Sequence, residues 1–247
     1  MVDLSGRRVL VVGASSGIGR AVVARFAAAG DHVVAVGRDR GALEAAGAAE
    51  AEVCDVTDEA EVATLFERLG PIDVLVNNAG VATSAPLERT TLDDWRTHLD
   101  VNATGAFLCT RAAVGGMIAR GNGRIVTVAS TAGLAGARYT AAYSASKHAA
   151  VGLMRAVAAE VAGTGVTANA VCPAYVRTDM TRRSIARIVA ATDRSEEEAE
   201  AALVATSPLG RLLEPEEVAF AVAFLADPAA GAINGQTLVL DGGGIQT

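Results

Sequence analysis

The chain has 247 residues, of which 51% are hydrophobic and 20% are charged, so its composition is that of a globular protein and not of a disordered one. Its 21 basic and 28 acidic residues give a formal net charge of −7, which argues against binding of duplex nucleic acid through a basic face. Cys54, Cys109 and Cys172 lie far apart in the sequence, and there are only three histidines, so we expect neither a disulfide framework nor a metal site. No stretch approaches the roughly 18 apolar residues of a membrane span, and we expect a cytoplasmic protein without a membrane partner.

Short apolar segments alternate with helical patterns along the chain. The pattern predicts strands at 9–12, 32–36, 52–56, 72–76, 124–129, 167–172 and 237–240. It predicts helices at 17–29, 58–69, 91–120, 141–163 and 215–227. Strands that alternate with helices indicate βαβ units, and strands that are apolar throughout indicate a parallel sheet covered on both faces. We therefore predict an α/β fold: one Rossmann-type, doubly wound sheet of about seven parallel strands, with helices on both faces, in a single domain spanning residues 1–247.

One polar segment, residues 178–210, interrupts this alternation. It holds Arg182, Arg183 and Arg187, and then the acidic run 196–198. We expect a helical insertion that forms a substrate lid beside the carboxyl edge of the sheet, where doubly wound folds bind ligands.

A glycine-rich turn follows the first predicted strand and opens the first helix. Gly13 permits a tight turn, Gly17 lets a phosphate approach the backbone, and Gly19 allows close packing of helix and strand. The free N–H groups of the helix terminus then face the phosphates. This turn predicts dinucleotide binding by Gly13, Ser15, Ser16, Gly17, Ile18 and Gly19.

The end of the second strand indicates which dinucleotide is bound. An acidic residue here usually bonds the ribose hydroxyls of NAD, but this chain has Gly37, followed by Arg38. The guanidinium of Arg38, with that of Arg40 as a further candidate, suits a 2′-phosphate. NADP(H) is therefore favoured, with NAD left open because Asp39 also lies here.

Ser130, Tyr143 and Lys147 form the second chemical signal. Lys147 is the one lysine among the 21 basic residues, and it lies four residues after Tyr143, on the same face of a predicted helix. An adjacent ammonium favours the phenolate and so lowers the pKa of a tyrosine from its usual value near 10. Ser130 ends the fifth predicted strand, at the ligand-binding edge. The three residues predict proton transfer at this edge.

Together these motifs resemble the short-chain dehydrogenase/reductase family along essentially the whole chain. The family's glycine turn matches residues 12–19, with Val12 in place of its threonine, and its N-N-A-G motif matches residues 77–80. Its proline–glycine pair after the sixth strand matches Pro173 and Ala174, a second mild departure. The resemblance adds cofactor contacts at Asp55, Val56, Asn78, Ala79, Gly80, Tyr143, Lys147, Pro173, Val176 and Thr178.

The resemblance also implies roles in catalysis. Tyr143 is expected to be the general acid in reduction, and Ser130 to stabilise charge on the carbonyl oxygen. Lys147 is expected to lower the pKa of Tyr143 and to bind the nicotinamide ribose, while Asn102 holds a water beside it. The implied activity is hydride transfer between NAD(P) and a ketone or secondary alcohol, by a homotetramer.

The segments around Ser130 and Tyr143 look most like those of β-ketoacyl and polyketide ketoreductases, which reduce a ketone on a thioester held by coenzyme A or an acyl carrier protein. The phosphates of such a carrier fit the arginines at 177, 182, 183 and 187, but a solvated helix face paired with the acidic run 196–198 explains these arginines equally well. Arg120 matches one of two basic residues that such enzymes use beside the active site for a carrier protein, but Thr164 stands at the other. Alternatives are a dehydrogenase of a 3-hydroxyacyl ester or of a cyclic or steroid-like alcohol. A free 3-hydroxy acid is disfavoured because Ala132 and Thr140 replace the residues that bind its carboxylate. A non-catalytic cofactor sensor is the remaining alternative.

Overall fold

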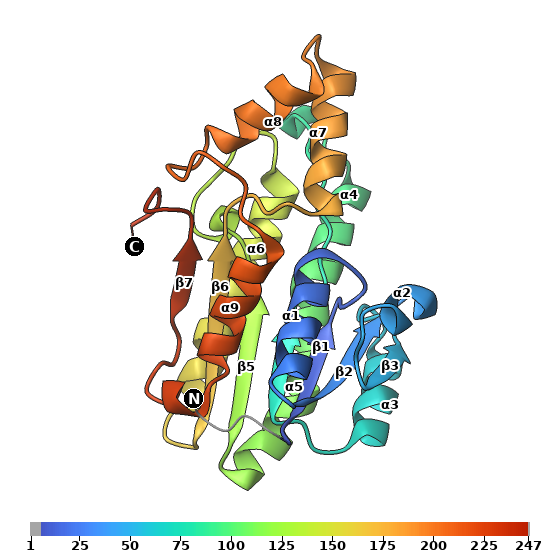
Figure 1. Ribbon diagram of the computed structural model, residues 1–247, viewed down its shortest axis with the longest axis vertical. Coiled ribbons are helices and arrows are strands. Elements are labelled where there is room, and N and C mark those ends of the chain that lie inside the picture. Colours follow the sequence, from blue (N-terminus) through green and yellow to red (C-terminus); the bar gives the residue numbers. More distant parts are fainter. Residues whose placement is uncertain (1–5, 247) are drawn as a thin grey trace.

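The computed structural model describes residues 6–246, so residues 1–5 and 247 of the predicted domain lie outside the described part. Seven parallel strands form one sheet in the order β3-β2-β1-β4-β5-β6-β7, which confirms the predicted doubly wound fold (Figure 1). The strands are β1 (Arg8–Val12), β2 (His32–Gly37), β3 (Glu50–Val53), β4 (Val74–Asn77), β5 (Gly123–Val128), β6 (Val166–Pro173) and β7 (Thr237–Leu240).

Helices cover both faces of the sheet because successive strand residues point to opposite sides. Val9 and Val11 of β1 pack with the helices of one face, including α1 and α9, whereas Leu10 and Val12 pack with those of the other, including α3, α5 and α6. The helices are α1 (Gly17–Ala28), α2 (Arg40–Glu44), α3 (Glu59–Leu69), α4 (Leu92–Leu99), α5 (Gly105–Arg120), α6 (Ala141–Glu160), α7 (Asp179–Ala191), α8 (Glu196–Val204) and α9 (Pro215–Leu225). None of those described is long and apolar enough to cross a membrane.

The strand order reverses at β1, which lies between β2 and β4. The loops after β1 and β4 therefore diverge at the carboxyl edge and leave a crevice between them, which is where such sheets bind ligands. Helices α7 and α8 rise beyond this same edge (Figure 1) and pack on each other through Ile185, Ala199 and Leu203. The predicted helical insertion at 178–210 thus contains two helices, α7 and α8.

Two predicted elements differ from the structure. The third strand is Glu50–Val53, not 52–56, so Asp55 and Val56 lie in the loop beyond it. The predicted helix 91–120 is interrupted by a π-helical segment, Asp100–Thr104, in which the Gly105 N–H donates to the carbonyl of Asp100. This five-residue hydrogen-bond spacing inserts a residue into the helix without breaking its apolar pattern, so periodicity does not reveal it. The short helix α2 was also not predicted.

Candidate active site

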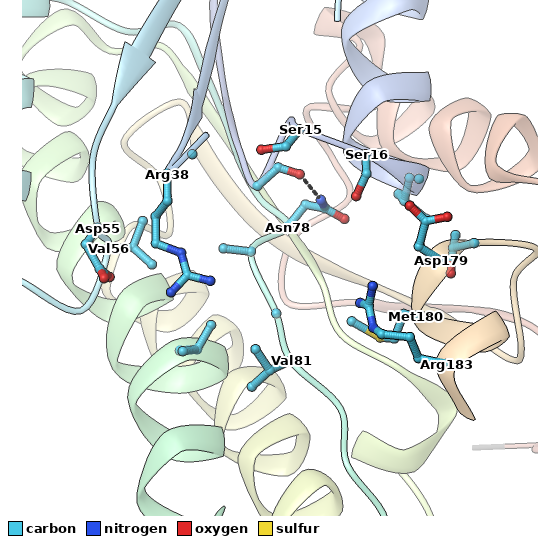
Figure 2. A pocket seen from close by; sticks show the side chains of 18 of the residues that line it. Ser15, Ser16, Arg38, Asp55, Val56, Asn78, Val81, Asp179, Met180 and Arg183 are labelled. Atoms are coloured by element: carbon cyan, nitrogen blue, oxygen red, sulfur yellow. Dashed lines mark hydrogen bonds between the residues drawn. The ribbon is translucent and has the colours of Figure 1, made fainter. Parts of the chain in front are cut away.

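A cavity of about 270 Å³ opens at the carboxyl edge, between the loops that follow β1, β2, β3 and β4 and the start of α7 (Figure 2). Most of the predicted dinucleotide contacts line it. They are Gly13, Ser15, Ser16, Gly17, Ile18, Arg38, Asp55, Val56, Asn78, Ala79, Gly80 and Thr178.

The glycine turn depends on close backbone approach. A Cβ on Gly13, whose φ is +77°, would lie 2.5 Å from the nitrogen of Ala79. A Cβ on Gly19 would lie 2.1 Å from the carbonyl oxygen of Gly13, so Gly19 lets α1 start directly behind the turn and does not itself line the cavity. Asn78 Nδ2 donates to that same carbonyl at 2.8 Å. The backbone N–H groups in the first turn of α1 are therefore available to bind a phosphate, as a diphosphate site requires.

Of the charged residues at the end of β2, two have partners within the fold and one faces the cavity. Asp39 accepts a hydrogen bond from Ala42 N at 3.1 Å and caps α2. Arg40 is exposed and pairs with Glu44 at 3.8 Å. Arg38 extends into the cavity on the side where Asp55 and Val56 lie (Figure 2). Hydrogen bonds from Thr57 hold the pKa of Asp55 below its usual range, and the charge of Arg38 adds to this lowering. Asp39 is thus occupied as a helix cap, while Arg38 faces the ligand space.

Lys147 is buried beside the carboxyl end of β5. Its Nζ donates to the carbonyl oxygen of Val128 at 2.9 Å. Burial lowers the pKa of this ammonium to about 8, since the low-dielectric surroundings disfavour the charged form. Gly133 permits the approach of the loop after β5, because a Cβ there would lie 2.8 Å from the carbonyl oxygen of Lys147.

Tyr143 lies one helical turn before Lys147, and its ring centroid is 5.9 Å from Nζ. Burial raises the pKa of its phenol, and the hydroxyl of Ser130 acts against this shift through a hydrogen bond. In the protein alone this pKa is thus raised, contrary to the expected lowering by Lys147, because desolvation by burial is the largest cause of the shift. The phenol remains protonated at neutral pH.

Asn102 lies in the π-helical segment between α4 and α5. Its Oδ1 accepts from Val81 N at 2.8 Å, and its Nδ2 donates to Val81 O at 3.0 Å and to Ser146 Oγ at 2.9 Å. A Cβ on Gly80 would lie 3.2 Å from Asn102 Oδ1 and 3.6 Å from Lys147 Nζ. The segment after β4 therefore joins Asn102 to Lys147 and the cavity.

Two predicted contacts, Pro173 and Val176, do not line the cavity. Pro173 ends β6 and pairs with Leu240, while buried Val176 forms a bridge with Leu213. The Val176 carbonyl accepts from Thr181 Oγ1 at 2.6 Å. Thr178, in contrast, lines the cavity and caps α7. Like Ser130, Tyr143 and Lys147, Pro173 and Val176 are not part of the cavity lining.

Several arginines that could meet a substrate carrier are occupied elsewhere. Arg177 pairs with Glu214 at 3.0 Å, Arg182 pairs with Asp179, and Arg187 donates to the carbonyl of Ala82 at 3.0 Å. The partners of Arg177 are Glu200 and Glu214, not the predicted run 196–198.

Arg120 is not beside the active site of its own chain. It donates to the carbonyl of Ile72 at 2.6 Å, just before β4 and hence at the opposite edge of the sheet.

Sequence reasoning did not assign some lining residues to the cofactor. They are Gly37, Cys54, Val81, Val101, Asp179, Met180 and Arg183. The sequence marks Gly37 as a position without a carboxylate and Arg183 as a candidate for carrier phosphates, but neither as a cofactor contact. The others are apolar or satisfied locally, so nothing in their spacing marks them.

Comparison with known proteins gives the same family. Residues 13–244 match the family described as enoyl-(acyl carrier protein) reductase. A Streptomyces coelicolor protein named as a ketoacyl reductase is 40% identical over 248 aligned residues, 95% of each chain. The actinorhodin polyketide ketoreductase solved with NADPH is 39% identical, with a TM-score of 0.90 over 98% of each chain. A Beutenbergia cavernae structure with NADP, named as a gluconate 5-dehydrogenase, is 44% identical, with a TM-score of 0.87 over 98% of this chain and 97% of that one. The chain belongs to the short-chain dehydrogenase/reductase family.

Proposed function

We propose that the protein is an NADPH-dependent ketoreductase that converts the ketone of a β-ketoacyl or polyketide-type thioester to a secondary alcohol. The observation that carries this proposal is the placement of Ser130, Tyr143 and Lys147 at the same sheet edge as a glycine-lined cavity that Arg38 faces. The relatives support the reaction class, since two of them are named for reduction of a ketone.

The cavity fits a phosphorylated dinucleotide. Its glycines leave room that a Cβ would fill, and the first turn of α1 presents N–H groups at the turn. Arg38 would hold the 2′-phosphate, the turn at residues 13–19 the diphosphate, and Asp55 and Val56 the adenine side. When bound, the cofactor supplies the hydride.

Tyr143 and Ser130 act on the carbonyl oxygen. The raised pKa of Tyr143 keeps its proton in place at neutral pH, so the phenol can donate it as the oxygen gains negative charge. The Ser130 hydroxyl donates a hydrogen bond to the same oxygen and stabilises that charge, while its own oxygen is oriented by Ala132 N at 3.1 Å. At neutral pH these two groups are therefore in the protonation state that reduction requires.

Lys147 and Asn102 fix the positions of the backbone segments that form the site. The hydrogen bond from Nζ to Val128 ties Lys147 to the end of β5, leaving its other protons for ribose hydroxyls. Asn102 fixes both backbone groups of Val81, which lines the cavity, and also Ser146, next to Lys147. Asn102 is thus a positioning residue between cofactor and proton donor.

Whether the ketone is carried by coenzyme A, carried by a protein or free depends on the basic residues that could bind the carrier. Thr164 stands where a second basic residue beside Arg120 is expected for docking of a carrier protein, so a ketone carried by coenzyme A or a free ketone is favoured over one on a carrier protein. A second candidate is oxidation of a polyhydroxy acid, which the 44% identity to the protein named as a gluconate 5-dehydrogenase favours.

We further propose a cytoplasmic homotetramer. Exposed aromatic side chains occur on helices of both faces, Phe107 on α5 and Phe220 and Phe224 on α9. Such surfaces are typical of subunit interfaces. Light scattering coupled to size-exclusion chromatography measures the mass directly, and a monomer would contradict the proposal.

The activity test follows NADPH absorbance with β-ketoacyl-CoA esters and cyclic ketones, and NADP⁺ reduction with gluconate. We expect turnover with the thioesters and loss of it in Tyr143→Phe. Turnover only with gluconate would establish the second candidate. Cofactor binding without turnover of any carbonyl or alcohol would identify a sensor and overturn the enzymatic proposal.

A further inference from the structure

Arg183 presents a second positive charge to the cavity, from the lid side. It lines the cavity with Thr178 and Met180, and its guanidinium points into the space facing Asn78 (Figure 2). Its neighbours on α7 are engaged, Arg182 with Asp179 and Arg187 with the carbonyl of Ala82. Among residues 6–246, Arg183 makes no ion pair or hydrogen bond through its guanidinium, so it is available for a ligand.

The acidic side chains of the cavity are already satisfied. Asp55 accepts from Thr57 N at 3.0 Å and from Thr57 Oγ1 at 2.8 Å, and Asp179 pairs with Arg182. The lining therefore keeps two uncommitted charges, Arg38 and Arg183, both positive. A ligand with separated negative groups complements this distribution.

The glycine turn lies between these two arginines. A Cβ on Gly37, next to Arg38, would lie 2.7 Å from Ser15 Oγ. At the other side, a Cβ on Gly17 would lie 2.9 Å from Thr178 Cγ2, and Thr178 caps the helix that carries Arg183. Arg183 is one turn after Asp179, so the lid helix projects it over the start of α1.

We infer that Arg183 is a cofactor-binding residue that donates hydrogen bonds to the diphosphate bound at the glycine turn, opposite the backbone N–H groups of α1. This rests on the proposed dinucleotide. The two arginines then bind different groups of the cofactor. Arg38 binds the 2′-phosphate, which is present only in NADPH, and Arg183 binds the diphosphate, which NADPH and NADH share. Cofactor binding would also tie α7 to the β1 side of the cavity, so the lid forms part of the cofactor site.

Fluorescence titration of the purified protein with NADPH and with NADH separates these roles without requiring turnover. We expect Arg183→Ala to raise the Kd of both cofactors about tenfold, as for loss of a charge-assisted contact, and Arg183→Lys to restore part of the affinity. Arg38→Ala should raise the Kd of NADPH alone. Arg194→Ala, an exposed change in the same 178–210 segment, is the matched control and should change neither.

Circular dichroism and thermal unfolding check that each variant is folded. A Kd within twofold of wild type for Arg183→Ala would overturn the inference, as would an unchanged Kd with a raised KM for the ketone, which would assign Arg183 to the substrate. A change for NADPH alone would also overturn it. Failure of the wild-type protein to bind either cofactor would instead refute the proposed function, and the inference with it.

Discussion

The two sides of the active site are built by different means. On the β1 side, the site depends on glycines, which have no Cβ: Gly13, Gly17 and Gly19 let backbone groups approach one another and a phosphate. On the β5 side, buried polar side chains make it: Lys147 and Asn102 are held by backbone carbonyls and amides. The first side should therefore fail when an atom is added, and the second when a polar atom is removed.

The largest effect should come from removing one oxygen on the β5 side. Tyr143→Phe deletes the proton donor, and general acid catalysis contributes about 10²–10⁴-fold, so we expect kcat to fall by about 10³-fold. The Kd of NADPH should stay within a few-fold of wild type. Tyr139→Phe, an exposed position in the loop just before α6, is the control and should retain activity. Full turnover by a folded Tyr143→Phe protein would refute the mechanism.

The next largest effect should come from adding one methyl group on the β1 side, at Gly19. The Cβ of Gly19→Ala would lie 2.1 Å from the Gly13 carbonyl oxygen, so α1 must move and the turn must open. We expect a loss of about 3 kcal/mol in the free energy of unfolding, typical of a severe overpacking, with weakened cofactor binding. Urea denaturation measures this change.

Gly152→Ala provides the matched control for that methyl group. Its Cβ meets nothing within 4 Å on α6, so it should stabilise the helix by up to ~1 kcal/mol. Equal effects at the two glycines would show that close approach at the turn is not what Gly19 provides.

Lys147 tests the β5 side through pH. Its folded-state pKa of about 8 lies below the ordinary 10.5, so between these values the unfolded chain binds more protons and wild-type stability rises with pH. The cost of burying the ammonium is complete below pH about 8 and disappears toward pH about 10.5. We therefore expect Lys147→Met to exceed wild type in stability most at neutral pH, with the gap narrowing over this range. Urea denaturation at several pH values gives the gap, and a constant difference would contradict the assigned burial.

Arg38 tests recognition at the far end of the β1 side. Arg38→Ala removes the group facing the 2′-phosphate, so we expect the Kd of NADPH to rise about tenfold while that of NADH is unchanged. Arg40→Ala, which removes an exposed arginine paired with Glu44, should leave both constants unchanged. A larger effect at Arg40 would move the phosphate site from the cavity to the surface of α2.

The β1 side was predictable from sequence because its signal is local. Seven residues, 13–19, contain the whole turn, and strand alternation gave the sheet. The β5 side was recognisable from Tyr143 and Lys147 at helical spacing, but the local environment of Asn102 was not. The π-helical segment leaves the apolar pattern intact, and it positions Asn102 through contacts with Val81, 21 residues away.

The third strand and the segment 178–210 could not be predicted fully for a different reason, since both depend on contacts with distant parts of the chain. β3 is at the edge of the sheet, where one neighbour alone fixes its ends, and it stops at Val53 before the apolar pattern ends. Arginines in and beside the segment 178–210 pair with distant residues, as Arg177 does with Glu214, 37 residues away. Composition shows that charges are present, but only the tertiary structure shows which of them, like Arg183, remains uncommitted.

Substitution of Asp39 should give the smallest effect, and it distinguishes a role in capping α2 from a role in the choice of cofactor. Its carboxylate caps α2 through Ala42 N, so Asp39→Ala should cost about 1 kcal/mol in the free energy of unfolding, whereas Asp39→Asn retains a good cap and should cost little. If the carboxylate instead opposed a 2′-phosphate, both variants would bind NADPH more tightly than wild type. Equal NADPH affinities in all three proteins, with reduced stability in Asp39→Ala alone, would assign this aspartate to the fold and leave cofactor choice at this strand end to Arg38.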